Sequence, residues 1–155
     1  MILNKLRLDN TVVVELDVTK QLVTPNKQTP VRVVIVLGAD GYRRGYIEYN
    51  ETGIANPSLL WDCFDVEAHG GVTYDERISS VTRVLGFDCA HYLDAQDTKA
   101  VINYRDNGEL DSDKCSNELL FDRDYGEIRT AQYVRDCLVA GLKLYKEELS
   151  LESLK

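Results

Sequence analysis

Residues 31–49, VRVVIVLGADGYRRGYIEY, are the stretch on which the predicted fold rests. Val31–Gly38 is almost continuously apolar and rich in β-branched side chains, which is typical of a central strand covered on both faces. Asp40-Gly41 follows at once, and this dipeptide between two strand-like runs is a strong hairpin signal. Tyr42–Tyr49 is then the return strand, in which Gly45 indicates a bulge or a close approach of another part of the chain.

On the N-terminal side of this hairpin, alternating polar and apolar side chains over Thr11–Val18 predict another strand. One face of that strand is expected to carry Val12, Val14, Leu16 and Val18. Residues 21–30, QLVTPNKQTP, hold two prolines among polar side chains, so they predict a loop that leads into the central strand.

On the C-terminal side, residues 50–58, NETGIANPS, are rich in turn formers and predict a loop that can form a rim over a site. Residues 59–66, LLWDCFDV, fit either a helical turn or a strand. Val81–Phe87 and Lys99–Tyr104 predict further strands. Residues 105–114 predict a turn or a long loop, and their spaced acidic side chains lack the terminal glutamate of a calcium-binding EF-hand.

The clearest element is a helix over Ala131–Leu149, with Thr130 as its N-cap. Its apolar positions recur at helical spacing, at Val134, Leu138, Leu142, Tyr145 and Leu149. Its opposite face is polar, with Gln132, Arg135, Asp136, Lys143 and Lys146. Together these patterns predict an α+β fold, a mostly antiparallel sheet with a long C-terminal helix packed on one face. The length of 155 residues predicts a single domain over residues 1–155, with its core in 11–149.

Charge and hydropathy exclude several classes of protein. No run reaches the roughly 18 apolar residues of a membrane span, so we expect no membrane partner. The formal net charge of −8 argues against direct nucleic-acid binding, which needs clustered Lys and Arg. The first residues alternate in polarity, unlike a signal peptide, so a cytoplasmic location is expected, in the host cell if the protein is viral. The acidity favours solubility. Alternatively, it makes the chain a nucleic-acid mimic, an acidic decoy that occupies a basic partner.

Four cysteines are spread through the chain without a CxxC pair, so a zinc ribbon or a thioredoxin-type motif is not expected. Scattered cysteines are mostly small buried hydrophobes, which is our expectation for Cys63, Cys115 and Cys137. Cys89 lies two residues before His91, and a nucleophilic Cys89 is therefore a further, weaker hypothesis.

Both histidines of the chain lie in Glu67–Asp94, EAHGGVTYDERISSVTRVLGFDCAHYLD, with carboxylates around each. Neutral imidazole is the commonest metal ligand, and histidine changes charge near neutral pH. His69 and His91 with Asp88 or Asp94 would make a metal set of two histidines and one carboxylate, with open positions for water and substrate. A divalent ion held there would activate water to hydrolyse an ester or a phosphodiester.

Other roles for this stretch stay open. The same His69, Asp88 and His91 could act as acid and base without a metal, although the hydroxyl partner of two-histidine phosphodiesterases is absent. Binding without chemistry is another possibility, with Gly70 and Gly71 shaping an anion nest. Arginines would then clamp a phosphate, and aromatic rings would stack a base; the candidates are Arg43, Arg44, Arg77, Arg83, Tyr74, Phe87 and Tyr92. A purely structural role competes with all of these, because His69 could cap a turn while Asp88 and His91 staple a loop.

The motif HGGVTYDE … VLGFDCAHYLD resembles a family of small, largely uncharacterised proteins of tailed phages and prophages. The resemblance covers roughly residues 42–146, and the chain departs from the pattern over 50–63, where the family has a Gly-His-Pro loop. The matching positions are Gly45, Tyr46, His69, Gly70, Gly71, Thr73, Gly86, Phe87, Asp88, Cys89, Ala90, His91, Asp94, Thr130 and Tyr133. The resemblance implies a phage accessory protein, a class that often counters host defence, and it implies no particular reaction.

The leading hypothesis from the sequence is a phage-type accessory protein of the counter-defence class. It would bind a host protein or a nucleotide-like, phosphate-bearing small molecule through the His69–Asp94 region, with Thr73 among the ligand contacts. The alternatives are a metal-dependent hydrolase using His69, Asp88, His91 and Asp94, and the acidic decoy. No cofactor is expected, a divalent metal is possible, and the chain could form a homo-oligomer.

Overall fold

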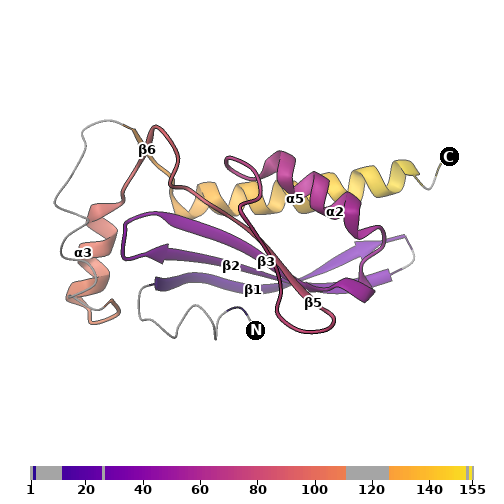
Figure 1. The fold of residues 1–155 in the computed structure, drawn as a ribbon, viewed down its shortest axis with the longest axis horizontal. Helices are drawn as coiled ribbons and strands as arrows, with labels where there is room; N and C mark the ends of the chain where they lie inside the picture. The colour runs from indigo at the N-terminus through magenta and orange to yellow at the C-terminus, as the bar shows by residue number, and fades with distance from the viewer. Residues whose placement is uncertain (1, 3–11, 26, 111–125, 153, 155) are drawn as a thin grey trace.

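The computed structural model describes residues 2, 12–25, 27–110, 126–152 and 154. Within them, five strands form an antiparallel sheet of order β1-β2-β3-β5-β4: β1 (Val12–Thr24), β2 (Lys27–Gly38), β3 (Arg43–Asn50), β4 (Tyr74–Arg77) and β5 (Thr82–Asp88). The other elements are η1 (Glu51–Gly53), α2 (Pro57–Glu67), α3 (Thr98–Asp106), α5 (Ala131–Glu152), and β6 (Asp94–Ala95) paired in parallel with β7 (Glu127–Ile128). Figure 1 shows α5 and α2 side by side along the sheet, with α3 at one end. The predicted α+β fold is confirmed.

The central hairpin forms as its sequence predicts. Gly41 has φ +86° and donates its backbone N–H to Gly38 O at 2.9 Å, which closes the turn. Val31, Val33 and Ile35 of β2 pack under the helices, while Val34 and Val36 belong to a second apolar cluster on the other face. A strand buried on both faces needs an almost continuous apolar run, and this requirement explains the composition of β2.

The long C-terminal helix also follows its prediction. Thr130 Oγ1 accepts a hydrogen bond from Tyr133 N at 3.1 Å, so Thr130 is the N-cap. The predicted apolar positions point into the core and the predicted polar ones into solvent: Val134, Leu138, Leu142 and Tyr145 are buried, Leu149 is half-buried, and Gln132, Arg135, Asp136, Lys143 and Lys146 are exposed. At Gly45, α5 comes so close that an added Cβ would lie 2.7 Å from Val134 Cγ1, which is the predicted close approach.

In β1 the prediction of a single apolar face is wrong. A bulge lies between Val14 and Leu16, so that Val14 pairs with Val36 while Leu16 pairs with Ile35. Because one extra residue reverses the alternation, Val12 and Val14 join the cluster on the open face, whereas Leu16 and Val18 join the core under the helices. The bulged residue is Glu15, whose carboxylate reaches Arg43 Nε at 2.6 Å.

Two other sequence predictions are corrected. Residues 21–30 are not a loop, because β1 and β2 run on to a tight connection at Thr24–Lys27. Pro30 is tolerated there because β3 pairing begins only at Val31. Lys99–Tyr104 is not a strand but part of α3, which Asp97 starts by accepting a hydrogen bond from Ala100 N at 3.2 Å.

Residues 59–66 are helical, since Asn56 caps α2 and Pro57 occupies its first turn. Val81–Phe87 is confirmed as a strand, shifted by one residue to β5. Thr11, residues 111–114 of the predicted loop, and Cys115 lie outside the described residues. None of the described helices is long and apolar enough to span a membrane.

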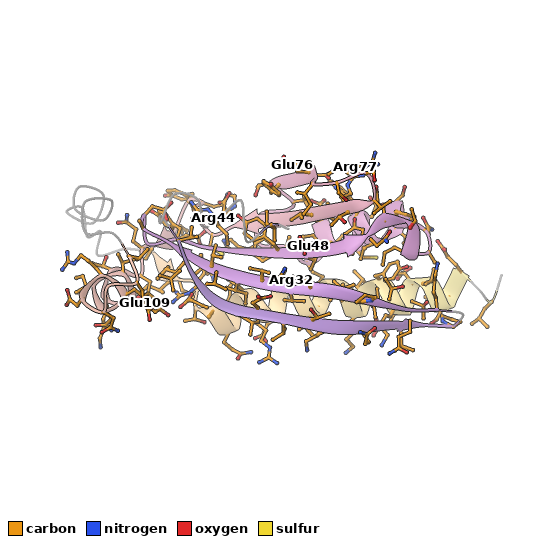
Figure 2. The ribbon with its side chains drawn as sticks, turned by 90° about the horizontal axis from the view of Figure 1, so that it is seen from below. Arg32, Arg44, Glu48, Glu76, Arg77 and Glu109 are labelled. Carbon is orange, nitrogen blue, oxygen red and sulfur yellow. The ribbon has the colours of Figure 1, made fainter. Side chains whose placement is uncertain are left out.

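The face of the sheet opposite the helices carries an apolar cluster beside a row of charges. Val34, Val36, Tyr46 and Val84 pack there with Ile2. Figure 2 labels Arg32 and Glu48 close together on this face, and Arg32 Nη1 lies 3.7 Å from Glu48 Oε2. Glu48 also accepts the backbone N–H of Ile2 at 2.8 Å, which ties the N-terminal end to β3.

Candidate functional site

His69 is placed by the turn that follows α2. Ala68 caps the helix, and Gly70 (φ +73°) and Gly71 (φ +85°) reverse the chain toward β4. Gly71 N–H donates to Ala68 O at 3.0 Å, so this group is used within the turn rather than aimed at an anion. The Gly-Gly pair therefore supports a turn, which was the structural reading of these residues.

His91 is placed by a second turn, between β5 and β6. His91 N–H donates to Asp94 Oδ2 at 3.0 Å, and Asp94 N–H donates to His91 O at 3.0 Å. Leu93 sits inside this turn with φ +71°, a left-handed conformation that is strained for a branched side chain. These two bonds fix the loop and set the direction of the His91 ring.

The two turns bring the histidines together. His69 Nε2 lies 2.7 Å from Asp94 Oδ2, and the centroids of the two imidazole rings lie 5.4 Å apart. A Cβ on Gly70 would be 2.5 Å from His91 Nε2, so the absence of a side chain at position 70 makes room for this ring. The side chain of His69 is 14% exposed and that of His91 is 37% exposed. The structure thus brings both rings and Asp94 together at one place.

Two residues that the sequence reasoning did not select complete this arrangement. Arg129 Nε donates to Asp94 Oδ1 at 2.9 Å, and the Tyr133 hydroxyl lies 2.8 Å from His69 Nδ1. The Arg129 guanidinium also lies 4.9 Å from the centroid of the Tyr133 ring. Tyr133 was visible only as a position of the phage-protein motif, and no local pattern marks Arg129. We call His69, His91, Asp94, Arg129 and Tyr133 the histidine cluster.

Asp94 is the centre of the histidine cluster, with a side chain only 1% exposed. Burial raises the pKa of Asp94. Hydrogen bonds from Arg129 and His69 lower this pKa by more than burial raises it, so the pKa lies below its usual value. An ionised Asp94 accepts from His69 Nε2–H, which leaves Nδ1 of a neutral ring as the acceptor of the Tyr133 proton. Burial raises the pKa of Tyr133, so its hydroxyl keeps that proton.

Because of this network, His69 has both ring nitrogens engaged inside the protein. His91 is the accessible ring, with Nε2 3.5 Å from Asp88 Oδ1. Thr73 Oγ1 donates to Asp88 Oδ2 at 3.3 Å, so Thr73, Asp88 and His91 lie together at the surface. Any direct contact with a ligand would therefore involve this outer group, and His69 would act from behind it.

The predicted metal set is not assembled among the side chains that the structure describes. Zinc lies about 2.0–2.2 Å from a nitrogen or oxygen ligand. His69 Nε2 and Asp94 Oδ2, 2.7 Å apart, already form a direct hydrogen bond with no room for an ion between them. Among the described residues, no group of three or more His, Cys, Asp or Glu side chains is arranged to hold a metal ion. We therefore derive no reaction step through a metal.

The arginines predicted to clamp a phosphate are all paired with carboxylates, although Arg44 lies opposite Asp88 in the β3–β5 pairing and Arg43 Nη1 donates to Arg129 O at 3.2 Å. Arg43 is buried and bonds Glu15 and Asp97, at 2.6 and 2.8 Å. Arg44, labelled in Figure 2, bonds Asp40 at 2.7 Å. The remaining two are Arg83, which bonds Asp75 and Glu51, and Arg77, which bonds Glu51. The phosphate clamp expected from the sequence is therefore not assembled at the histidines.

The three aromatic residues predicted to stack a base also lie in different parts of the structure. Tyr74 packs edge-on against Tyr46 on the open face of the sheet, with ring centroids 5.5 Å apart. Phe87 is buried in the core under the helices. Tyr92 is 88% exposed, next to His91. Of the three rings, only Tyr92 lies where a partner of the histidine cluster could touch it.

Cys89 is unsuited to be a nucleophile. Its side chain is buried, and burial raises the pKa of its thiol to about 12. Cys63 is buried as well, as expected, while Cys137 is half-buried; all three are free thiols.

Comparisons with protein-family models, with curated proteins and with solved structures give no match to this chain. The resemblance to phage accessory proteins therefore rests on the motif residues alone.

Proposed function

We propose that this chain is a binding protein that contacts a protein partner through residues 90–93, which we call the 90–93 tip. All four residues of the tip are exposed, with Tyr92 at 88% and Leu93 at 53%. An exposed tyrosine next to an exposed leucine offers amphipathic and apolar contact area, and tyrosine is among the residues that most often dominate binding energy. This exposed pair is the observation that carries the proposal.

Hydrogen bonds at the base of the 90–93 tip support the binding proposal, because they hold the loop in one conformation before a partner binds. Asp94 Oδ2 accepts from His91 N, and Leu93 O accepts from Glu127 N at 2.8 Å. Gly126, with φ +103°, lies so close that a Cβ there would meet Leu93 O at 2.8 Å. A loop fixed in its binding conformation loses little entropy on association, so more of the contact energy appears as affinity.

The charges near the tip favour a protein over a phosphate-bearing small molecule. Arg129, the cation of the histidine cluster, is already paired with Asp94 at 2.9 Å and with Glu127 at 3.2 Å. The outer group adds the carboxylate of Asp88, which would repel a phosphate. A host protein as the partner, and a counter-defence role, are what the resemblance to phage accessory proteins adds to this proposal.

The test is affinity capture from the cells in which the chain is naturally made, with quantitative mass spectrometry. The tip variant Tyr92→Ala/Leu93→Ala is compared with wild type and with Val66→Ala, an apolar side chain on α2 whose exposed fraction, 71%, lies between those of Tyr92 and Leu93. We expect at least one protein that wild type and Val66→Ala enrich equally and that the tip variant loses by tenfold or more. If every captured protein is retained by the tip variant, the proposal is wrong.

The closeness of the two rings, 5.4 Å between centroids, favours one alternative, hydrolysis by His69, Asp88 and His91. Its metal-dependent form stays a prediction that metal analysis can test. About one equivalent of divalent ion in the purified wild type, lost in His91→Ala, would support it. Without retained metal, and without turnover of a phosphodiester such as bis-p-nitrophenyl phosphate, the binding proposal stands alone.

A further inference from the structure

A groove lies between the far end of the β1–β2 hairpin and α5. Its volume is about 470 Å³. Leu22 and Val31 form one wall, and Leu142 and Val139 of α5 form the other. The first three are buried, whereas Val139 is 38% exposed at the mouth. The walls of the groove are therefore apolar, and the groove opens to solvent beside β1, the edge strand of the sheet.

Three lysines surround this groove, which we call the lysine groove: Lys20 from β1, and Lys143 and Lys146 from α5. Within the part of the chain that the structure describes, none of their ammonium groups lies in an ion pair, which is equally true of Lys27 and Lys99, so these three are available to an anion. Glu147 is the one carboxylate in the lining. In a chain of net charge −8, this is a local excess of positive charge around an apolar cavity.

We propose that this lysine groove binds a free fatty acid, with the acyl chain along Leu22, Leu142 and Val139. The carboxylate would then accept hydrogen bonds from the lysines at the mouth, since charge-assisted bonds of this kind are the stronger ones. The stems of Lys143 and Lys146 add apolar surface to the walls while their ammonium groups stay in water. The volume falls in the range of cavities that hold small ligands.

Two other occupants fit less well. The groove follows α5 over residues 139–147, which is about 12 Å of helix, too short to seat a partner helix of several turns. A second copy of this chain placed on the same groove would bring its three lysines against these three, so like charges would oppose the contact. A single fatty acid, with one acyl chain and one carboxylate, matches both the size and the charge of the groove.

The test is isothermal titration of dodecanoate, kept below its micelle concentration, into the purified protein. We expect saturable binding of one dodecanoate per chain, and about fourfold weaker binding for each methylene removed. Dodecanol has the same chain without the carboxylate and should bind at least tenfold more weakly. Lys143→Glu/Lys146→Glu should weaken dodecanoate binding at least tenfold, while Lys99→Glu, an exposed lysine on α3, should leave it unchanged.

Val139→Trp provides an independent check, because it fills the mouth and leaves every charge in place. It should also weaken dodecanoate binding at least tenfold, with an unchanged circular dichroism spectrum. No saturable binding, equal binding of dodecanol, or full affinity in Val139→Trp would each overturn the proposal. Tyr92→Ala/Leu93→Ala should bind dodecanoate like wild type, so this site and the 90–93 tip succeed or fail separately.

Discussion

Asp94 is the residue on which the histidine cluster depends, because its buried carboxylate accepts hydrogen bonds from Arg129, His69 and His91 N. Asp94→Asn keeps the shape of the side chain and removes its charge. We expect it to lower the free energy of unfolding by about 3 kcal/mol, since breaking a buried ion pair costs roughly 3–5 kcal/mol and Arg129 stays partly in water. Urea-induced unfolding at pH 7 measures the change.

The difference in unfolding free energy between wild type and Asp94→Asn should decrease at low pH. The pKa of Asp94 is raised by burial and lowered more by Arg129 and His69, so it lies below that of the unfolded chain. Its contribution is therefore complete above about pH 4 and is lost as the pH falls through the folded-state pKa. The gap between wild type and Asp94→Asn should narrow below about pH 4. Asp106→Asn, exposed at the end of α3, is the control, and an equal loss there would contradict the central role of Asp94.

A second residue-scale prediction concerns Cys89. With a thiol pKa of about 12, only about one Cys89 in ten thousand is a thiolate at pH 8, and the thiolate is the reactive form. A short iodoacetamide pulse at pH 8, followed by peptide mapping, reports each cysteine separately. We expect Cys89 to be alkylated at less than 1% of its rate in urea. Comparable rates in the two conditions would mean that Cys89 is reachable and reactive in the folded chain.

At the scale of elements, the contact between α5 and β3 can be tested through Gly45. A methyl group there would lie 2.7 Å from Val134 Cγ1 and 3.2 Å from Leu138 Cδ1. We expect Gly45→Ala to lower the free energy of unfolding by about 2 kcal/mol, within the usual range for an overpacked core. In a Val134→Ala background the closest of these contacts is removed, while those to Phe87 Cζ at 3.1 Å and Leu138 Cδ1 remain, so the cost should fall by about half. Additive losses in thermal or urea unfolding would contradict the close approach.

The elements that were predicted correctly have local signals. Asp40-Gly41 specifies its own turn, and Val134 and Leu138 carry the helical period of α5 within a few residues. The bulge at Glu15 has no such signal, because what stabilises it is the buried pair with Arg43, 28 residues away. Residues 99–104 have strand-like side chains, yet the Asp97 cap and the burial of Val101 determine a helix. At Glu15 a tertiary contact outweighs local propensity, whereas at residues 99–104 the Asp97 cap is a local signal that outweighs the strand-like side chains.

In the candidate site, too, some residues have a local sequence signal and others are brought in only by tertiary packing. His69, His91 and Asp94 could be selected because they share one short stretch and one kind of chemistry. Tyr133 reaches them from the first turn of α5 and Arg129 from the segment between β7 and α5, and only the packing of α5 on the sheet brings them there. Arg43 and Arg83 were selected for their charge, but the sequence does not reveal that Glu15 and Asp75 neutralise them.

For the whole molecule, the distribution of charge separates the two binding hypotheses that remain. The net charge of −8 comes from 26 acidic and 18 basic side chains, and the acidic decoy would use this excess directly. Such binding weakens steeply with salt, because the Debye length falls from about 10 Å at 0.1 M to about 3 Å at 1 M. Contacts of Tyr92 and Leu93 depend mainly on burial of apolar surface, which salt does not screen.

We therefore predict that the captured partner stays on the immobilised chain at high salt. Its dissociation constant should change by less than about threefold between 0.1 and 1 M sodium chloride, since Tyr92 and Leu93 supply most of the contact. Tyr92→Ala should lose the partner at both concentrations, because the tip is then missing its largest exposed side chain. Surface plasmon resonance over a salt series makes both measurements. A steep decline with salt, together with unchanged binding by Tyr92→Ala, would reject the 90–93 tip and favour the acidic decoy.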